Sequence, residues 1–312
     1  MSTEGCAEPE GIEWCEWDPD GVELFYDTSV FYSHLLKSEG VSELIEEVAD
    51  AFRWRATSTY LKLEYGNTVL NYCVWLKRIL RKKGFKGALE HVAEVLPAFH
   101  RGRRIFGLHL LTKYADRGGE DAAELAGAHL RRLIKTHLDA VSSYFDTPLE
   151  DGTGCYWAQK ESHLAKDGKT WRQVKCKPEK RRCRIDTFFE ENKEAFLRIR
   201  AAIGELQNPT AQLQDFAEII DEAVEDSAIL LDHRNCRRFG DALIAMDGSG
   251  YRNVFSQNPK EYRVLCQALG QTFVCLPAHA ERAVEVYDYA GAMAGDAAAD
   301  GHAMDRTGRA NG

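Results

Sequence analysis

The chain has 312 residues, of which 44% are apolar, and a formal net charge of −9 at pH 7. This composition excludes a fully disordered, fibrous or low-complexity protein, and no apolar run approaches the roughly 18 residues of a membrane span. The N-terminal stretch is acidic and lacks the basic and apolar regions of a signal peptide. We therefore expect a cytoplasmic globular protein with no membrane partner.

The acidic residues are unevenly distributed. Eight of the 49 acids lie in residues 1–24, which contain no Lys or Arg, so the remainder is nearly neutral and contains basic clusters. We expect residues 1–20 to form an acidic disordered tail. Residues 288–312, rich in Gly, Ala and Asp, are expected to form a second disordered tail.

Short apolar runs predict strands near both ends of the ordered region, and helical periodicity follows each of them. Strands followed by helices indicate an α/β fold with a parallel sheet flanked by helices. The predicted strands are 22–26, 53–58, 253–256 and 271–277. The predicted helices are 28–40, 42–52 (capped by Ser42), 59–84 (capped at Thr57–Thr59), 186–206, 211–233, 237–248 and 259–270.

The middle of the chain has a different pattern. Residues 85–147 have a helical sequence pattern with no strand-like alternation, whereas residues 148–185 are polar, rich in Gly and Lys, and contain clustered cysteines. We therefore expect a core made of residues 21–84 and 226–280, interrupted by a large, mainly helical insertion at 85–225.

Four acids lie just after a predicted strand or near the start of a helix. Asp27 ends the first strand, Glu64 lies in the helix after the second, Asp241 begins a short helix, and Glu261 follows the third strand. Ligands of open parallel sheets bind beyond the carboxyl ends of the strands. Clustered carboxylates repel one another unless a hard cation such as Mg²⁺ or Mn²⁺ lies between them. The alternative is that each acid caps a helix or interacts with its dipole.

The sequences around these acids, FYDTSVFYSHLL, ATSTYLKLEYGNTVL, GDALIAMD and VFSQNPKEYRVLCQALG, resemble in order the four acidic motifs of the PIN-domain nuclease family. The resemblance covers about a third of the chain. It implies that Asp27, Glu64 and Asp241 are metal ligands, with Glu261 or Asn258 as the fourth, and that a metal-bound water attacks a phosphodiester, usually of RNA. Two features depart from the family: Asn258 replaces a common Asp, and the stretch from Glu64 to Asp241 is longer than in a compact PIN domain.

A second candidate metal site lies in the polar stretch. Cys155, His163, Cys176 and Cys183 supply the four Cys or His ligands that structural zinc takes, although paired ligands usually lie only two to four residues apart. The alternative is a mobile basic loop with reduced thiols. Cys236 replaces His163 only if the fold brings it close.

Basic and aromatic residues predict where RNA would bind, because Lys and Arg contact phosphates while aromatic rings stack on unpaired bases. The alternatives are solvated helix faces for the basic residues and loop anchors for the Trp residues. The candidates are Lys82, Lys83, Arg103, Arg104, Trp157, Trp171, Lys180, Arg181 and Arg182.

The sequence thus predicts a PIN-like, Mg²⁺- or Mn²⁺-dependent endoribonuclease acting on single-stranded or structured RNA. Family association alone suggests a toxin or defence effector with an inhibitor or antitoxin protein as partner. One rival is a catalytically weak or inactive PIN-like scaffold that binds RNA or protein. Another is a helical interaction protein whose acids are all caps.

Overall fold

A computed structural model of the chain describes residues 22–36, 39–95, 101–155 and 183–276. Both predicted tails, 1–20 and 288–312, lie outside these residues. So do Trp157, His163, Trp171, Cys176 and Lys180–Arg182.

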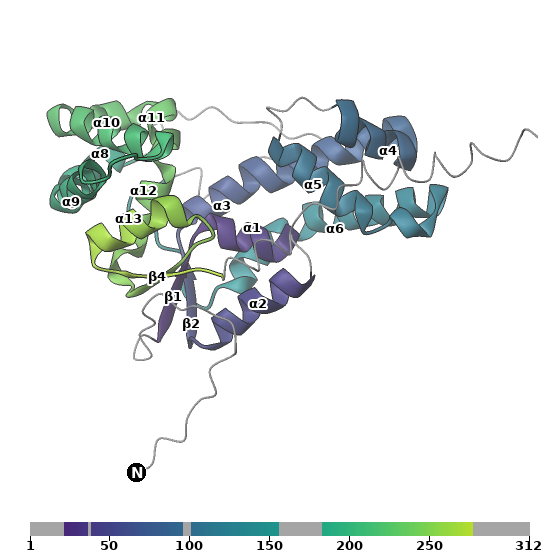
Figure 1. The fold of residues 1–312 in the computed structure, drawn as a ribbon, viewed down its shortest axis with the longest axis horizontal. Coiled ribbons are helices and arrows are strands. Elements are labelled where there is room, and N and C mark those ends of the chain that lie inside the picture. Colours follow the sequence, from purple (N-terminus) through teal and green to yellow (C-terminus); the bar gives the residue numbers. More distant parts are fainter. Residues whose placement is uncertain (1–21, 37–38, 96–100, 156–182, 277–312) are drawn as a thin grey trace, which may run out of the picture. The chain divides into compact units, whose positions relative to one another are not determined.

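The centre of the fold is a four-stranded, entirely parallel sheet with helices around it (Figure 1). The strand order is β2-β1-β3-β4, and Phe25 of β1 lies opposite both Ala56 and Val254. Parallel neighbours need crossover connections, which helices supply here. The α/β class and the flanked parallel sheet are therefore confirmed. The strands are β1 (Glu23–Tyr26), β2 (Trp54–Thr57), β3 (Asn253–Phe255) and β4 (Thr272–Val274).

Residues 146–150 run along the outer edge of β2. The Asp146 amide donates to the Arg55 carbonyl over 2.9 Å, and the Glu150 amide donates to the Thr57 carbonyl over 2.9 Å. The Thr59 amide in turn donates to the Glu150 carbonyl over 2.8 Å. This segment satisfies backbone groups that an edge strand would otherwise expose.

The connection from β1 to β2 contains α1 (Thr28–Leu36) and α2 (Glu39–Asp50). The prediction that the first helix ends at Gly40 and that Ser42 caps the second was wrong, because α2 already begins at Glu39. Ser42 instead hydrogen-bonds His34 on α1 through Oγ and Nδ1 over 3.0 Å. A tertiary contact has replaced the local cap.

The predicted helix 59–84 is divided in the structure. Ser58 caps α3 (Thr59–Tyr65), as expected, by accepting a hydrogen bond from the Tyr60 amide over 3.0 Å. A π-helical turn, η1 (Gly66–Leu70), then leads into α4 (Asn71–Glu90), in which Gly84 has a positive φ of 68° that glycine tolerates. Helix α4 packs against α5 (Arg101–Thr112) and α6 (Gly119–Tyr144), with η2 (His91–Val95) and η4 (Ala115–Arg117) as short connecting turns. In the part of the chain that the structure describes, no helix is long and apolar enough to cross a membrane.

The predicted helices 186–206, 211–233 and 237–248 are also divided. Asn192 divides the predicted helix 186–206 into two helices. The short side chains of Asp226 and Asp232 each cap a new helical turn by accepting hydrogen bonds from backbone amides. Such residues stop a helix that periodicity alone would continue. The resulting elements are α8 (Ile185–Glu191), α9 (Lys193–Gly204), α10 (Ala211–Glu225), η6 (Ser227–Leu231), α11 (His233–Arg238), α12 (Gly240–Asp247) and η7 (Gly248–Gly250).

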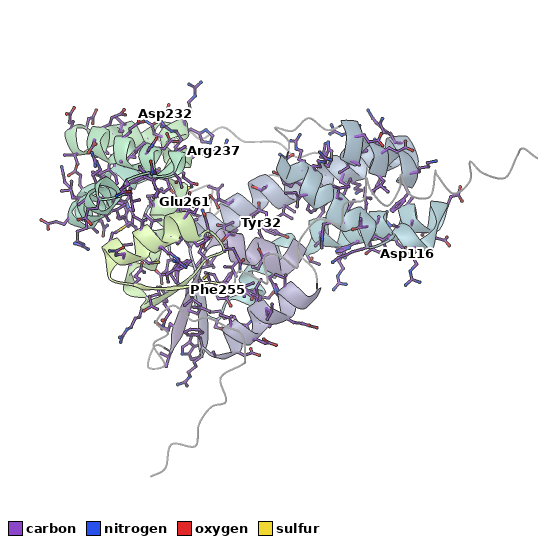
Figure 2. All side chains as sticks on the ribbon, viewed as in Figure 1. Tyr32, Asp116, Asp232, Arg237, Phe255 and Glu261 are labelled. Atoms are coloured by element: carbon purple, nitrogen blue, oxygen red, sulfur yellow. The ribbon has the colours of Figure 1, made fainter. Side chains whose placement is uncertain are left out.

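The chain then enters β3, which ends at Phe255, and continues into α13 (Pro259–Leu269), which carries Glu261 in its first turn (Figure 2). Pro259 suits the first helical position because its missing N–H has no partner there in any helix.

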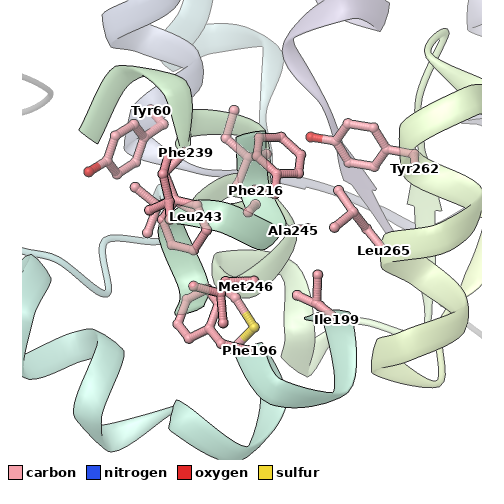
Figure 3. Packing of buried hydrophobic residues seen from close by; sticks show 14 of the residues in the cluster. Tyr60, Phe196, Ile199, Phe216, Phe239, Leu243, Ala245, Met246, Tyr262 and Leu265 are labelled. Carbon is pink, nitrogen blue, oxygen red and sulfur yellow. The ribbon is translucent and has the colours of Figure 1, made fainter. Parts of the chain in front are cut away.

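Helices α8–α10 share one buried cluster with the sheet and with α12 and α13. Phe196 stacks on Phe189 with ring centroids 4.9 Å apart and also contacts Phe239. Figure 3 shows Phe196 and Phe216 packed around Leu243 and Met246 of α12. The boundary predicted at residue 225 therefore runs through a continuous core.

Close packing at η7 predicts a sharp difference between two nearby glycines. A Cβ at Gly248 would lie 2.7 Å from Phe25 Cδ1, whereas one at Gly250 would meet nothing within 4 Å. Overfilling a packed core costs about 1–3 kcal/mol. We expect Gly248→Ala to lower the free energy of unfolding by that amount in a urea titration. Gly250→Ala is the matched control, and equal stability of the two variants would contradict the packing.

Candidate active site at the β1–β3 junction

The strand order places a topological switch point between β1 and β3. From β1 the chain crosses to β2 on one side, and later returns to β3 on the other side. Connections that leave neighbouring strands in opposite directions create the place where open parallel sheets bind ligands. Asp27 follows β1 there and Ser256 follows β3.

Asp27 is buried, with 3% of its surface exposed, and is held by donors on both carboxylate oxygens. Oδ2 accepts from Ser256 Oγ over 2.9 Å, from the Ser29 amide over 3.1 Å and from the Ser29 hydroxyl. Oδ1 accepts from the Tyr262 hydroxyl over 2.8 Å. Four donors fix the carboxylate in one orientation at the strand end.

Glu64 projects from α3 and lies close enough to Asp27 for the two charges to interact. A Cβ at Gly240, the first residue of α12, would lie 3.3 Å from Glu64 Oε1, so a glycine leaves room for the carboxylate. The pKa of Glu64 is raised to about 7, mainly by burial and also by the charge of Asp27, while the Thr28 hydroxyl and Arg237 lower it. A carboxyl with this pKa is protonated in a substantial fraction of the molecules near neutral pH.

Asp241 lies in the first turn of α12, next to Gly240. Burial raises its pKa well above the ordinary value, and the charges of Asp27, Glu64 and Glu261 add to this, whereas a hydrogen bond from Gln212 lowers it. Each of the other three predicted acids thus raises the pKa of Asp241 through its charge. The structure brings together the four carboxylates that the sequence singled out.

Glu261 is buried in the first turn of α13, where Oε1 accepts from Thr210 Oγ1 over 2.8 Å. Asn258 directly precedes this helix, and its backbone carbonyl accepts from the Tyr262 amide over 3.0 Å. Its own amide donates to Ser256 Oγ over 3.0 Å. The Asn258 backbone therefore orders the turn that carries Glu261.

Four acids confined in one buried region repel one another, and a divalent cation with oxygen ligands would relieve that repulsion. Among the described residues, no group of three His, Cys, Asp or Glu side chains stands in ligating geometry.

Only two of the four predicted zinc ligands, Cys155 and Cys183, lie in the part of the chain that the structure describes. Cys155 is buried, and Cys183 lies near it in the fold because the Arg184 amide donates to the Thr153 carbonyl over 2.8 Å. His163 and Cys176 lie outside the described residues. The sulfur of Cys236, the residue considered as a substitute for His163, lies 3.8 Å from the Tyr60 hydroxyl. Burial raises the pKa of Tyr60 most, and Cys236 and Cys155 raise it further, so both cysteines lie close to this side chain. The zinc site stays a prediction.

The predicted RNA-binding residues that can be placed lie on two packed helices. Lys82 and Lys83 are exposed on α4, and Arg104 is exposed on α5. Arg103 lies 5.9 Å from the ring centroids of both Tyr72 and Trp75 on α4, in cation–π range. Its charge is therefore anchored between the helices. Trp157, Trp171, Lys180, Arg181 and Arg182 lie outside the described residues.

Sequence reasoning missed several side chains around the acids. Ser256 and Tyr262 lie inside the fourth acidic motif, so their closeness to Glu261 in the sequence could have indicated that they belong to the site. Thr210 and Gln212 gave no signal, because their partners lie 51 and 29 positions away in the chain.

Comparisons with models of protein families, with curated proteins and with solved structures find no match to this chain.

The raised pKa of Glu64 predicts how stability changes with pH. Between about 4.5 and about 7 the unfolded chain has lost the Glu64 proton while the folded chain keeps it, so the free energy of unfolding falls as pH rises through that window. We expect Glu64→Gln to remove a part of this fall on the order of 3 kcal/mol at most, measured by urea unfolding at pH 5 and pH 8. The exposed Glu205→Gln is the control, and an unchanged pH dependence in Glu64→Gln would contradict the burial of this carboxyl.

Proposed function

We propose that this chain is a PIN-like, Mg²⁺- or Mn²⁺-dependent endoribonuclease. The observation that supports this most is the convergence of Asp27, Glu64, Asp241 and Glu261 at the β1–β3 switch point. Perturbed carboxyl groups gathered around one ligand-binding position are typical of functional sites. The motif resemblance supplies the reaction class.

In this proposal Asp27, Glu64, Asp241 and Glu261 hold the cation, with the side-chain oxygen of Asn258 as an additional ligand. The cation would make an attacking water more acidic and would offset charge on the attacked phosphate. Asp27 is the fixed reference ligand, because its orientation is set by Ser256, Ser29 and Tyr262.

Glu64 and Asp241 have a second role in the proposal, which follows from their raised pKa. Both must lose a proton before they can ligate a cation, because ligands bind metals in the deprotonated form. Cation affinity should therefore increase as pH rises towards and beyond neutrality.

RNA is the proposed substrate because exposed Lys82, Lys83 and Arg104 provide positive charge for phosphate contacts. Arg103, with Tyr72 and Trp75 below it, adds a basic and aromatic surface on the same helices. An inhibitor or antitoxin protein as partner rests on the family association.

The second candidate function is a PIN-like scaffold that binds RNA or protein without cleaving it. Two observations favour it: Asn258 provides a neutral amide where an acid is common, and no three described acids stand in ligating geometry without a cation. The cleavage experiment below separates the two functions.

We expect Mn²⁺-dependent cleavage of labelled single-stranded RNA by the intact chain, abolished by EDTA and reduced at least 100-fold in Asp27→Asn. The reason is that Asp27 is the proposed ligand with the most fixed orientation. Asp116→Asn, an exposed acid labelled in Figure 2, is the matched control and should retain full activity. RNA binding without cleavage, and no stabilisation by Mn²⁺, would favour the scaffold. Cleavage that survives in Asp27→Asn would contradict the site.

The basic surface on α4 gives a separate prediction. Lys82→Glu combined with Lys83→Glu should weaken RNA binding about 10-fold or more at low salt and flatten the dependence of affinity on salt concentration, because fewer counterions are released. Lys113→Glu combined with Arg117→Glu, two exposed charges outside the predicted clusters, gives the same change of net charge and is the control. Fluorescence anisotropy with labelled RNA provides the measurement. Equal losses in both proteins would argue against a specific surface.

A further inference from the structure

Two side chains at the start of α10 donate hydrogen bonds to two of the four acids. Gln212 Nε2 donates to Asp241 Oδ2, and Thr210 Oγ1 donates to Glu261 Oε1 over 2.8 Å. Thr210 is also the N-cap of α10 and accepts a hydrogen bond from the Leu213 amide over 3.3 Å. Because the cap fixes the orientation of the hydroxyl, its proton is directed at Glu261.

Helix α10 is itself attached to the elements that carry these acids. It packs against α9, which packs against α13, the helix of Glu261. Its Phe216 is fully buried and meets Phe239, the residue before α12, edge to face at 6.2 Å between ring centroids. Figure 3 shows Phe216 in the same packed group as Leu243 and Tyr262. The first turn of α10 is therefore held in a defined position relative to both carboxylates.

Each donor engages only one oxygen of its carboxylate. Asp241 keeps Oδ1, and Glu261 keeps Oε2, as acceptors for another ligand. The two acids repel each other electrostatically. The hydrogen bonds from Gln212 and Thr210 oppose rotation of the two carboxylates away from each other.

We propose that Gln212 and Thr210 are positioning residues that orient Asp241 and Glu261 for binding of a divalent cation. This inference rests on the proposed function and deepens it, because it assigns a role in cation binding to a helix that lies outside the acidic motifs. Hydrogen bonds to ligating groups orient those groups, and their loss typically lowers metal affinity 10- to 100-fold.

Gln212→Ala tests the proposal, and Gln214→Ala is its matched control. Gln214 lies on the same helix, and its Nε2 also donates a hydrogen bond, but to the Pro209 carbonyl over 3.4 Å. We expect Gln212→Ala to weaken Mn²⁺ binding 10- to 100-fold, measured from the signal of free Mn²⁺ in electron paramagnetic resonance. Gln214→Ala should bind Mn²⁺ as the wild type does. In RNA cleavage, saturating Mn²⁺ should restore kcat in Gln212→Ala, since the defect lies in cation affinity.

Two further variants keep the test decisive. Gln212→Met preserves side-chain length and removes the donor, so it replaces Gln212→Ala if that chain does not fold, as judged by circular dichroism. Thr210→Ser keeps both the cap and the donor and should retain wild-type Mn²⁺ affinity.

The outcomes separate this role from the proposed function. Wild-type Mn²⁺ affinity in Gln212→Ala and Gln212→Met would overturn the positioning role and leave the nuclease proposal standing. Wild-type protein that neither binds Mn²⁺ nor cleaves RNA would overturn both. Weakened Mn²⁺ binding in Gln212→Ala with normal binding in Gln214→Ala and Thr210→Ser would support the role.

Discussion

The pairing of β1 with β3 is the constraint on which the rest of the site depends. The Asp27 amide donates to the Phe255 carbonyl over 2.9 Å, which extends the ladder beyond the last residue of β1. The Asp27 carboxylate then accepts from Ser256, just after β3, and from Tyr262 on α13. One residue thus joins two strand ends and a helix through both its backbone and its side chain. Any shift in the register of β1 against β3 would separate these partners.

The acids around Asp27 work against the stability of the folded chain. Burial and mutual repulsion raise the pKa of Glu64 and of Asp241, so their ionised forms are unfavourable in the folded state. A protein selected only for stability would place apolar residues there, since well-packed hydrophobic groups often replace buried charges without loss. The hydrogen bonds from Gln212 and Thr210 compensate for only part of this cost. Groups that reduce stability in this manner cluster at functional sites, which is why the proposal is centred here.

The sequence predicts those parts of the fold that depend on local chemistry. Apolar runs locate all four strands to within a few residues, and the Ser58 cap places the start of α3. The four acids could be singled out because each lies just after a strand or near the start of a helix. Features that depend on distant partners could not be predicted. Ser42 forms a good local cap in principle, but His34 takes its hydroxyl, and the donor from Gln212 to Asp241 exists only because α10 packs on the core. Residues 146–150 are too short and polar to resemble a strand, yet they pair with β2.

The separation in sequence of the two central strands also affects how the chain reaches its folded form. Asp27 and Ser256 are 229 positions apart, so the hydrogen bond between them closes a loop that contains most of the described helices. Closing a long loop is entropically costly before its contacts form, and such topologies fold slowly. During synthesis the helical segments can form as soon as they emerge, whereas β1 must wait for β3, which is among the last described segments to be made. After β1 has been made and before β3 follows, β1 lacks one of its two neighbouring strands, and its apolar side chains need protection from aggregation. The ribosome must therefore complete nearly the whole chain before the four carboxylates can meet, and a prematurely terminated product would lack the assembled site altogether.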